Sequence, residues 1–151
     1  MTVFKPIEYQ DIEVIVALMK VFYEIDAYSI DISVSQKNFA TFIANPNLGR
    51  AWLIYQKKEV VGYIILTFLF SFEYGGTIAF LDELYLAKNS RGKGLGKKAV
   101  AFVKDQAKQH KLRLLYLEVE RHNSTGQKLY LAAGFEFHNR NLMRIKLNDR
   151  N

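Results

Sequence analysis

The chain has 151 residues, contains no cysteine and carries a formal net charge of +6. Half of its residues are hydrophobic and 24% are charged, a balance that argues against a disordered or fibrous protein. Its length favours one domain over residues 1–151, and the lack of cysteine excludes disulfides, thiol nucleophiles and thiolate metal sites. We expect a soluble, cytoplasmic protein, because the longest apolar stretch, residues 60–70, is too short to span a bilayer and no signal peptide is recognisable.

Charge is divided unevenly along the chain. Residues 1–80 hold six basic and eight acidic residues, a net charge of −2, whereas residues 81–151 hold fifteen and seven, a net charge of +8. The second part is therefore suited to an anionic partner. Composition alone leaves open whether this partner is a nucleic acid, a membrane surface or a phosphorylated small molecule.

The first half of the chain predicts a strand, two helices and three more strands. Residues 2–5 are the first expected strand, and apolar residues at helical spacing predict a helix over residues 11–25. Ser33 is the expected N-cap of a second helix, which ends before Pro46. β-Branched and aromatic residues predict an antiparallel meander of three strands, over residues 51–56, 59–72 and 77–86.

The second half predicts two more helices and a closing hairpin. A glycine-rich loop leads into the first of these helices. The elements expected here are a helix over residues 95–110, a strand over 112–118, a helix over 123–133 that ends at Gly134, and a hairpin of residues 135–138 with 142–147. This order predicts an α/β (α+β) fold, a mixed, mostly antiparallel sheet of six to seven strands flanked by about four helices. The apolar last strand is a candidate interface for a homodimer.

The glycine-rich loop is the strongest candidate for a ligand site. Glycines at 92, 94 and 96 allow several backbone N–H groups to face one ligand, and the helix that follows adds its positive dipole end. Such a place binds phosphate well. The spacing matches neither the dinucleotide fingerprint nor the P-loop. The basic side chains around the loop are those of Arg91, Lys93, Lys97 and Lys98.

Three motifs in the second half resemble one family. Arg91 to Gly96 match the [RQ]-x-x-G-x-[GA] signature, and the residues Asp82 to Leu86 lie directly before it. Asn123, Tyr130 and Gly134-Phe135 follow at the spacing of the second helix and its exit. On these motifs the chain resembles the GCN5-related N-acetyltransferases (GNAT), and its layout is most similar to the diamine and polyamine acetyltransferase branch. The resemblance is specific from residue 82 to 135 and weak over residues 1–50.

The resemblance implies acetyl-coenzyme A as co-substrate. The loop amides would hold its pyrophosphate, and the backbone of the strand before the loop would pair with the pantetheine arm. Asn123 and Tyr130 lie seven residues apart, so we expect both on one helix face, with Gly126 leaving room for the cofactor. The cofactor-binding residues implied are Leu84, Tyr85, Leu86, Arg91, Gly92, Lys93, Gly94, Leu95, Gly96, Lys97, Asn123 and Tyr130.

The resemblance also implies catalytic roles. Tyr130 would protonate the leaving thiolate as a general acid. The amine must lose a proton, and the candidates for the base are Glu83 and Asp82. The family has a bulge here, so the sequence does not show which of the two side chains turns inward, and Glu83 is favoured. Glu118 and Glu120 are less favoured. The histidines lack the spacing of metal ligands, so no metal is expected.

The acceptor implied is a primary amine on a small cationic metabolite, to which acetyl is transferred directly because no cysteine or Ser-His-Asp arrangement offers a nucleophile. Acidic residues in the first half and at positions 82 and 83 would attract such a cation. The alternatives are an acetyltransferase for a protein, a peptide or a charged tRNA, and a non-catalytic acyl-coenzyme A-binding module. A membrane partner is not expected, and the absence of a known nucleic-acid-binding motif disfavours a nucleic-acid partner.

Overall fold

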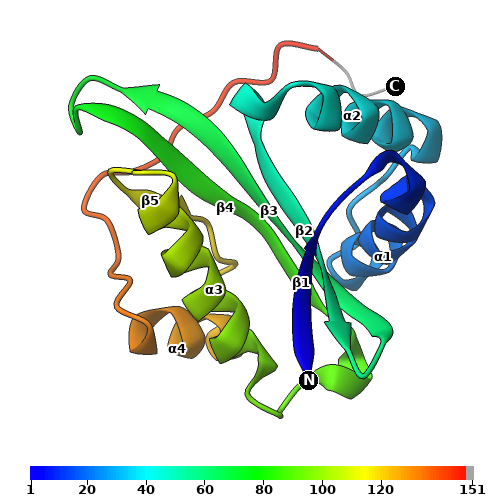
Figure 1. Ribbon diagram of the computed structural model, residues 1–151. Coiled ribbons are helices and arrows are strands. Elements are labelled where there is room, and N and C mark those ends of the chain that lie inside the picture. Colours follow the sequence, from blue (N-terminus) through cyan, green and yellow to red (C-terminus); the bar gives the residue numbers. More distant parts are fainter. Residues whose placement is uncertain (149–151) are drawn as a thin grey trace.

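The computed structural model describes residues 1–148. Over these residues the chain forms four α-helices, five strands and three short 3-10 helices (Figure 1). In chain order the elements are β1 (Thr2–Pro6), η1 (Tyr9–Asp11), α1 (Ile12–Ile25), α2 (Ile32–Ala44), η2 (Pro46–Leu48), β2 (Gly49–Gln56), β3 (Glu59–Ser71), β4 (Gly76–Leu86), η3 (Lys88–Ser90), α3 (Leu95–Gln109), β5 (Leu115–Leu117) and α4 (Ser124–Ala132).

The sheet is mixed and mostly antiparallel, as predicted. Its strands lie in the order β1-β2-β3-β4-β5, with antiparallel pairing up to β4 and parallel pairing between β4 and β5. Consecutive strands joined by short turns explain the antiparallel part. The α3 helix and the loops around it provide the crossover that a parallel pair requires. The fold class expected from the sequence is thereby confirmed.

Both faces of the sheet are buried, each under two helices (Figure 1). Along β2 and β3, alternate side chains point to opposite faces. Leu53 and Tyr63 belong to the core under α1 and α2, whereas Ile54 and Ile64 belong to the core under α3. This alternation explains why both strands read as nearly continuous apolar runs in the sequence.

The predicted closing hairpin is absent from the described residues, and the sheet has five strands instead of six to seven. Residues 135–138 and 142–147 form no strand there. The Arg140 guanidinium binds the Glu73 carboxylate in the turn between β3 and β4. The chain therefore leaves residues 135–138 at this point and does not fold back to pair with them. The strand predicted over residues 112–118 is also shorter, because β5 pairs with β4 only from Leu115 to Leu117.

One helix start also differs from the expectation. Asp31, not Ser33, is the N-cap of α2, because its Oδ1 accepts a hydrogen bond of 3.0 Å from the Val34 amide. The Ser33 hydroxyl donates to the same carboxylate. Within residues 1–148, none of the helices is both long and apolar enough to cross a membrane.

Candidate active site

The two central strands of the site separate at Leu81. β4 pairs with β5 only over Ala79 to Leu81, and β4 then continues alone on this side as far as Leu86. The Ala87 amide donates to Val61 on β3, so alternation along the strand turns the amides of Leu84 and Leu86 toward the side that β5 leaves open. An extended ligand can therefore pair with this backbone edge.

A β-bulge lies at the point of separation. Ile65 of β3 faces Glu83, and the next residue, Leu66, faces Leu81, so Asp82 is an extra residue in β4. The extra residue reverses the alternation of side chains. Leu81 packs in the core under α3, whereas Tyr85 packs in the core under α1, and Glu83 shares that face.

Both carboxylate oxygens of Glu83 accept hydrogen bonds from tyrosines, and we call this group the carboxylate pocket (Glu83, Tyr23 and Tyr63). The Tyr23 hydroxyl donates to Oε2 and the Tyr63 hydroxyl to Oε1, each at 2.6 Å. Burial raises the pKa of the Glu83 carboxyl above its ordinary value, while both hydroxyls oppose that rise. Burial, chiefly, also raises the pKa of the Tyr63 hydroxyl, which therefore remains a proton donor.

Asp82 has a different environment. The residue as a whole is exposed, but partial desolvation of its carboxyl, as the main cause, and the negative charge of Glu118 raise the pKa of this carboxyl. No hydrogen bond from another described residue holds the Asp82 carboxylate in place. The structure thus brings Glu83, and not Asp82, into a fixed arrangement on the α1 side.

The glycine-rich segment after β4, which we call the phosphate loop (residues 91–97), leaves its amides open. None of the amides from Gly92 to Lys97 donates a hydrogen bond to another described residue. Gly92 and Gly94 have φ values of +76° and +77°, which side chains other than glycine adopt at a cost. Gly94 caps α3, and Arg91 binds the Leu86 carbonyl through Nε at 2.9 Å. The loop therefore offers a row of donors next to the open β4 edge.

Positive charge surrounds these amides. Lys93, Lys97 and Lys98 are exposed, as is Arg91. Among the described residues, none of them forms an ion pair with a carboxylate. The two remaining loop residues have packing roles, since Leu95 is buried under the sheet and Gly96 leaves just enough space for Leu129 of α4.

Asn123 lies at the start of α4 and not on its face. Its Oδ1 accepts a hydrogen bond of 2.9 Å from the Gly126 amide, so the side chain caps the helix. A Cβ on Gly126 would lie only 2.5 Å from the Asn123 Nδ2, which means that the asparagine fills the space expected for the cofactor. The side-chain nitrogen of Asn123, Nδ2, is still available to a ligand.

Tyr130 lies in α4 with its ring packed against the core under α3 and against Phe135. Burial raises the pKa of its hydroxyl, which stays protonated at neutral pH. No other described residue hydrogen-bonds to this hydroxyl. Tyr130 thus has a protonated, partly buried hydroxyl that forms no hydrogen bond with another described residue.

Two contacts join the first half of the chain to the segment between β5 and α4. The Tyr28 hydroxyl donates to Glu120, and the His122 Nε2 lies 3.2 Å from the Asp26 Oδ1. Asp26 and Tyr28 belong to the link between α1 and α2. These contacts hold the link between α1 and α2 against the segment that precedes α4.

An open strand edge that continues into a loop of free amides and lysines is suited to an extended, phosphorylated ligand. The Acetyltransferase (GNAT) family matches residues 15–135, most of the chain, and the protein belongs to this family. The resemblance drawn from the motifs is confirmed at the level of the family.

Two relatives in Bacillus illustrate the similarity. The chain is 32% identical over 81 residues to "Uncharacterized N-acetyltransferase YhfO" of Bacillus subtilis (strain 168), covering 54% of each chain. It is 36% identical over 58 residues to "Probable spermine N(1)-acetyltransferase" of Bacillus subtilis subsp. natto (strain BEST195), covering 38% of each. The chain therefore spans about half the length of the first relative and less of the second.

Solved structures are similar over nearly the whole chain. An integron cassette protein, HFX_CASS3, from the mobile metagenome of Cole Harbour Salt Marsh is 35% identical, with a TM-score of 0.88 over 97% of this chain and 91% of that one. A predicted acetyltransferase from Clostridium acetobutylicum, solved with acetyl-CoA, has a TM-score of 0.79 at 17% identity, over 98% and 96% of the two chains. The second likeness shows the fold alone.

Sequence reasoning did not find Tyr23 and Tyr63 as site residues. Both lie in patterns that predict core, Tyr23 on the apolar face of a helix and Tyr63 within an apolar strand. One signal was present, because a buried tyrosine hydroxyl requires a hydrogen-bond partner. The sequence did not show that the partner is Glu83, since the residues are 60 and 20 positions apart.

Proposed function

We propose that the protein transfers the acetyl group of acetyl-coenzyme A directly to a primary amine of a small cationic metabolite, such as a diamine or polyamine. The observation that carries this proposal is the continuity of the open β4 edge with the free amides of the phosphate loop. The edge suits the amide-bearing arm of coenzyme A, and the loop suits its pyrophosphate.

The residues present fit this co-substrate. The amides of Leu84 and Leu86 would pair with the pantetheine arm, whereas the Tyr85 side chain is buried in the core and its backbone carbonyl faces Gly62 of β3. The amides from Gly92 to Lys97 and the nearby basic side chains would hold the phosphates. Bound acetyl-coenzyme A would supply an acetyl group that is already activated as a thioester.

Tyr130 is the proposed general acid. Its hydroxyl is protonated and uncommitted, and it lies on the helix whose N-cap is Asn123. A leaving thiolate needs a proton, and general acid catalysis by a positioned group contributes about 10²–10⁴-fold. The side-chain nitrogen of Asn123, Nδ2, is the proposed donor to the pantetheine arm, since the side-chain oxygen already accepts the hydrogen bond that caps the helix.

Glu83 is the proposed base, and Tyr23 and Tyr63 position it. A carboxylate with a raised pKa is a better proton acceptor than an ordinary one, because its affinity for a proton is higher. The two hydroxyl donors favour its ionised form, against the effect of burial, and leave the remaining lone pairs for an ammonium group. Asp82, exposed and without a positioning partner, is the weaker candidate.

The proposed acceptor, a cationic amine, is supported by the acidic side chains and the tyrosine rings near Glu83. The carboxylate pocket combines a half-buried carboxylate with tyrosine rings, a combination that binds ammonium groups. Asp26 and Glu120 on neighbouring segments add negative charge, which suits an acceptor with a second ammonium group. The similarity to a probable spermine N(1)-acetyltransferase supports the same class.

Thiol release from acetyl-coenzyme A tests the proposal. The acceptors to compare are diamines, polyamines, amino acids, peptides with free N-termini and charged tRNA. We expect the highest kcat/KM with a diamine or polyamine. A preference for a peptide or tRNA would overturn the acceptor class, and tight cofactor binding without turnover on any amine would indicate a binding module.

A further inference from the structure

Arg50, near the start of β2, is held in place by contacts that leave its charge unbalanced. Its Nη1 donates to the carbonyl oxygens of Pro46 and Gly49, and its guanidinium carbon lies 5.4 Å from the centre of the Phe68 ring. None of the described carboxylates forms an ion pair with it. Nε and Nη2 are the two donors of one guanidinium edge, and neither hydrogen-bonds to another described residue. This free edge matches a carboxylate, which accepts two parallel hydrogen bonds from such a fork.

A hollow of about 370 Å³ lies beside Arg50, beyond the C-terminal end of α3. The turn η2 and the start of β2 form one wall, the paired ends of β3 and β4 form another, and the residues after α3 form the third. These walls include the side chains of Arg50, Phe68, Phe70, Thr77, His110 and Leu112. The volume is in the range of small-molecule sites. Because α3 has 15 residues, the hollow lies about 22 Å from the phosphate loop, at the other end of this helix.

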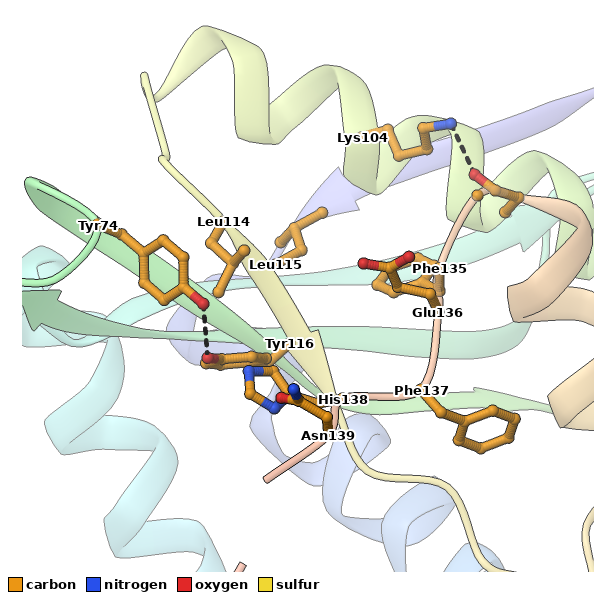
Figure 2. Close-up of a pocket in the computed structure, with 12 residues that line it drawn as sticks. Tyr74, Lys104, Leu114, Leu115, Tyr116, Phe135, Glu136, Phe137, His138 and Asn139 are labelled. Carbon is orange, nitrogen blue, oxygen red and sulfur yellow. Dashed lines mark hydrogen bonds between the residues drawn. The ribbon is translucent and has the colours of Figure 1, made fainter. Parts of the chain in front are cut away.

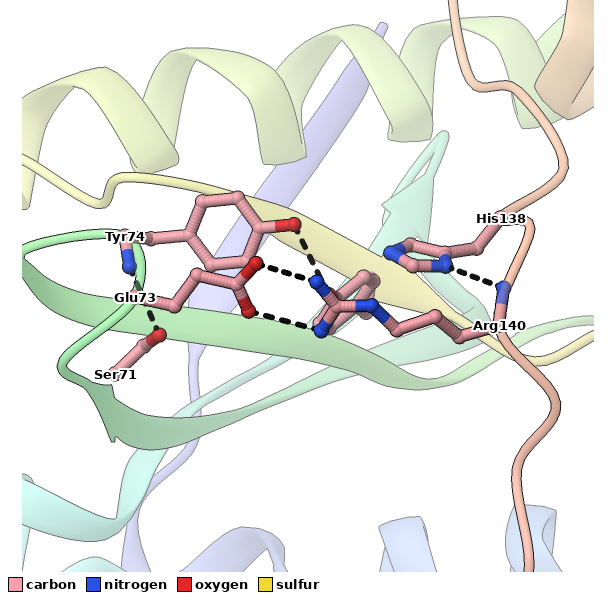
Figure 3. Close-up of polar contacts among 6 residues, drawn as sticks. Ser71, Glu73, Tyr74, His138 and Arg140 are labelled. Atoms are coloured by element: carbon pink, nitrogen blue, oxygen red, sulfur yellow. Dashed lines mark hydrogen bonds and ion pairs between the residues drawn. The ribbon is translucent and has the colours of Figure 1, made fainter.

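The charge of this hollow differs from that of its surroundings. Among the described residues that line it, Arg50 alone is charged at neutral pH, and none is acidic. The larger groove beside β5 holds charges of both signs, since Lys104 and Glu136 both line it (Figure 2). Arg140 is already neutralised by Glu73, which accepts two hydrogen bonds of 2.9 and 2.5 Å from it (Figure 3). Outside the phosphate loop, the hollow at Arg50 is therefore a second place that favours an anion.

His110 adds a second group that responds to an anion. Its ring centre lies 5.9 Å from that of Phe68. Burial, as the main cause, and the positive charge of Arg50 lower the pKa of its imidazole. The residues that line the hollow from β3 and β4 carry no charge, and the neighbouring Lys108 and Lys111 are exposed. A bound anion would offset the charge of Arg50 and thereby raise the pKa of His110.

We propose that this hollow is a second ligand site and binds a small aromatic carboxylate. The carboxylate would accept hydrogen bonds from Nε and Nη2 of Arg50 and from the protonated ring of His110. The aromatic ring would lie against Phe70, which is 64% exposed, and against Leu112. A plain anion would leave these apolar walls in water, and a neutral ring would leave Arg50 without a counter-ion. The proposal does not depend on the acetyltransferase proposal.

Binding of benzoate tests the ligand class. Benzyl alcohol keeps the ring without the charge, whereas acetate and inorganic phosphate keep a charge without the ring. Excess coenzyme A is present in every titration, so that benzoate bound within the proposed cofactor site would be competed away. We expect the Kd of benzoate, measured by NMR titration, to be lower than that of each control by at least about 10-fold. Equal affinity for acetate or phosphate, or no binding of benzoate, would overturn the proposal.

A matched pair of arginine variants locates the site. Arg50→Gln removes the proposed partner of the anion, whereas Arg113→Gln removes the same charge from an exposed side chain outside the hollow. We expect the first variant to raise the Kd of benzoate by at least about 10-fold and the second by less than about 2-fold. Because Arg50 also links η2 to β2, thermal unfolding of both variants is measured beside binding. An equal effect of the two variants on the Kd would contradict a site at Arg50.

Two exposed phenylalanines test the apolar wall with little effect on folding. Phe70 lines the hollow, whereas Phe72 is 92% exposed and does not line it. We expect Phe70→Ser to raise the Kd of benzoate by about 5-fold, because the stacking surface is lost, and Phe72→Ser to leave it nearly unchanged. Benzoate binding that is as tight in Phe70→Ser as in the parent protein would show that the ring does not lie in the hollow.

The pH dependence provides a readout that a structural role of these residues would not move. Histidine signals in proton NMR spectra give the pKa of His110, and His110→Gln assigns its signal. Because protonation and anion binding favour each other, we expect a higher pKa of His110 with benzoate bound. The affinity for benzoate should then increase at least about 3-fold as the pH falls through this pKa, and this increase should be absent in His110→Gln. An unchanged pKa of His110 while benzoate binds would place benzoate elsewhere and overturn the proposal.

Discussion

The phosphate loop and the carboxylate pocket satisfy their polar groups in opposite ways. In the phosphate loop, the amides from Gly92 to Lys97 have no partner among the described residues, and the lysines are exposed. In the carboxylate pocket, both oxygens of Glu83 already hold a tyrosine hydroxyl. The first region is prepared to receive its hydrogen bonds from a ligand, and the second is organised before a ligand arrives.

This difference separates binding from chemistry. A loop of open amides gains most of its contacts when phosphates bind, so changes there should affect cofactor affinity. A fixed carboxylate spends no binding energy on its own orientation, so changes there should affect the chemical step. The variants below test this division, beginning with the largest expected effect.

Glu83→Gln would remove the proposed base without changing its size. We expect kcat/KM for the amine to fall by about 10²–10⁴-fold while the Kd of the cofactor stays nearly constant. Asp82→Asn is the matched comparison, with an expected loss below about 10-fold, because an exposed carboxylate without positioning partners contributes less. Steady-state kinetics and calorimetric titration measure both quantities. A larger loss in the Asp82 variant would exchange the two roles.

Tyr130→Phe would remove one hydroxyl and keep the ring in its packing place. The expected result is a decrease of about 100-fold in kcat with little change in cofactor Kd, because the leaving thiolate loses its proton donor. The measurement is thiol release at saturating amine. An unchanged kcat would leave Tyr130 with a packing role only.

Gly94→Ala would strain the phosphate loop at a φ of +77°. The left-handed conformation costs alanine about 1–2 kcal/mol, and this strain is relieved if the loop moves. Because the loop amides would then no longer point at the phosphates, we expect the Kd of the cofactor to rise about 10-fold. Gly75→Ala is a control with the same strain, since Gly75 has a φ of +78° and open space around it, in a turn away from the loop. If both variants bind the cofactor equally well, the loop does not hold the phosphates.

Tyr63→Phe and Tyr23→Phe would each remove one donor to Glu83. Both hydroxyls lower the pKa of this carboxyl, so their loss raises it further, and the ionised form disappears at a higher pH. The acidic limb of the kcat/KM profile should move upward by roughly 0.5–1 pH unit for each hydroxyl. Tyr55→Phe, in the same core but without a contact to Glu83, should leave the profile in place. A downward shift would contradict the positioning role.

The sequence predicted those parts of the fold that depend on local patterns. The helices over residues 11–25 and 95–110 and the meander up to Leu86 lie close to their expected positions, because one side of each element must be apolar. The closing hairpin was wrong. Residues 142–147 alternate in sequence but form no strand in the described part of the chain, because alternation is a local pattern and does not show whether a neighbouring strand is there to pair with it.

The site shows the same contrast between local patterns, which the sequence reveals, and contacts between distant residues, which it does not. The phosphate loop was recognisable because its glycines and lysines lie next to one another in the sequence. Tyr23 and Tyr63 were not recognisable, because they reach Glu83 only after three separate elements have packed together. The role of Gly126 was misread for a similar reason, since the space beside it is filled by Asn123, a neighbour whose rotamer the sequence does not show.

The extra residue in β4 changes which side chains of the strand face each core. Before Asp82, Leu81 packs in the core under α3, whereas after it Glu83 and Tyr85 lie on the side of the core under α1. If β4 ran through Asp82 in regular alternation, Leu81 and Glu83 would share a face, so Glu83 would turn toward the core under α3 and Leu84 and Leu86 toward the core under α1. One inserted residue thus changes which side chains of β4 face each core, and this change falls at the point where β5 separates from β4.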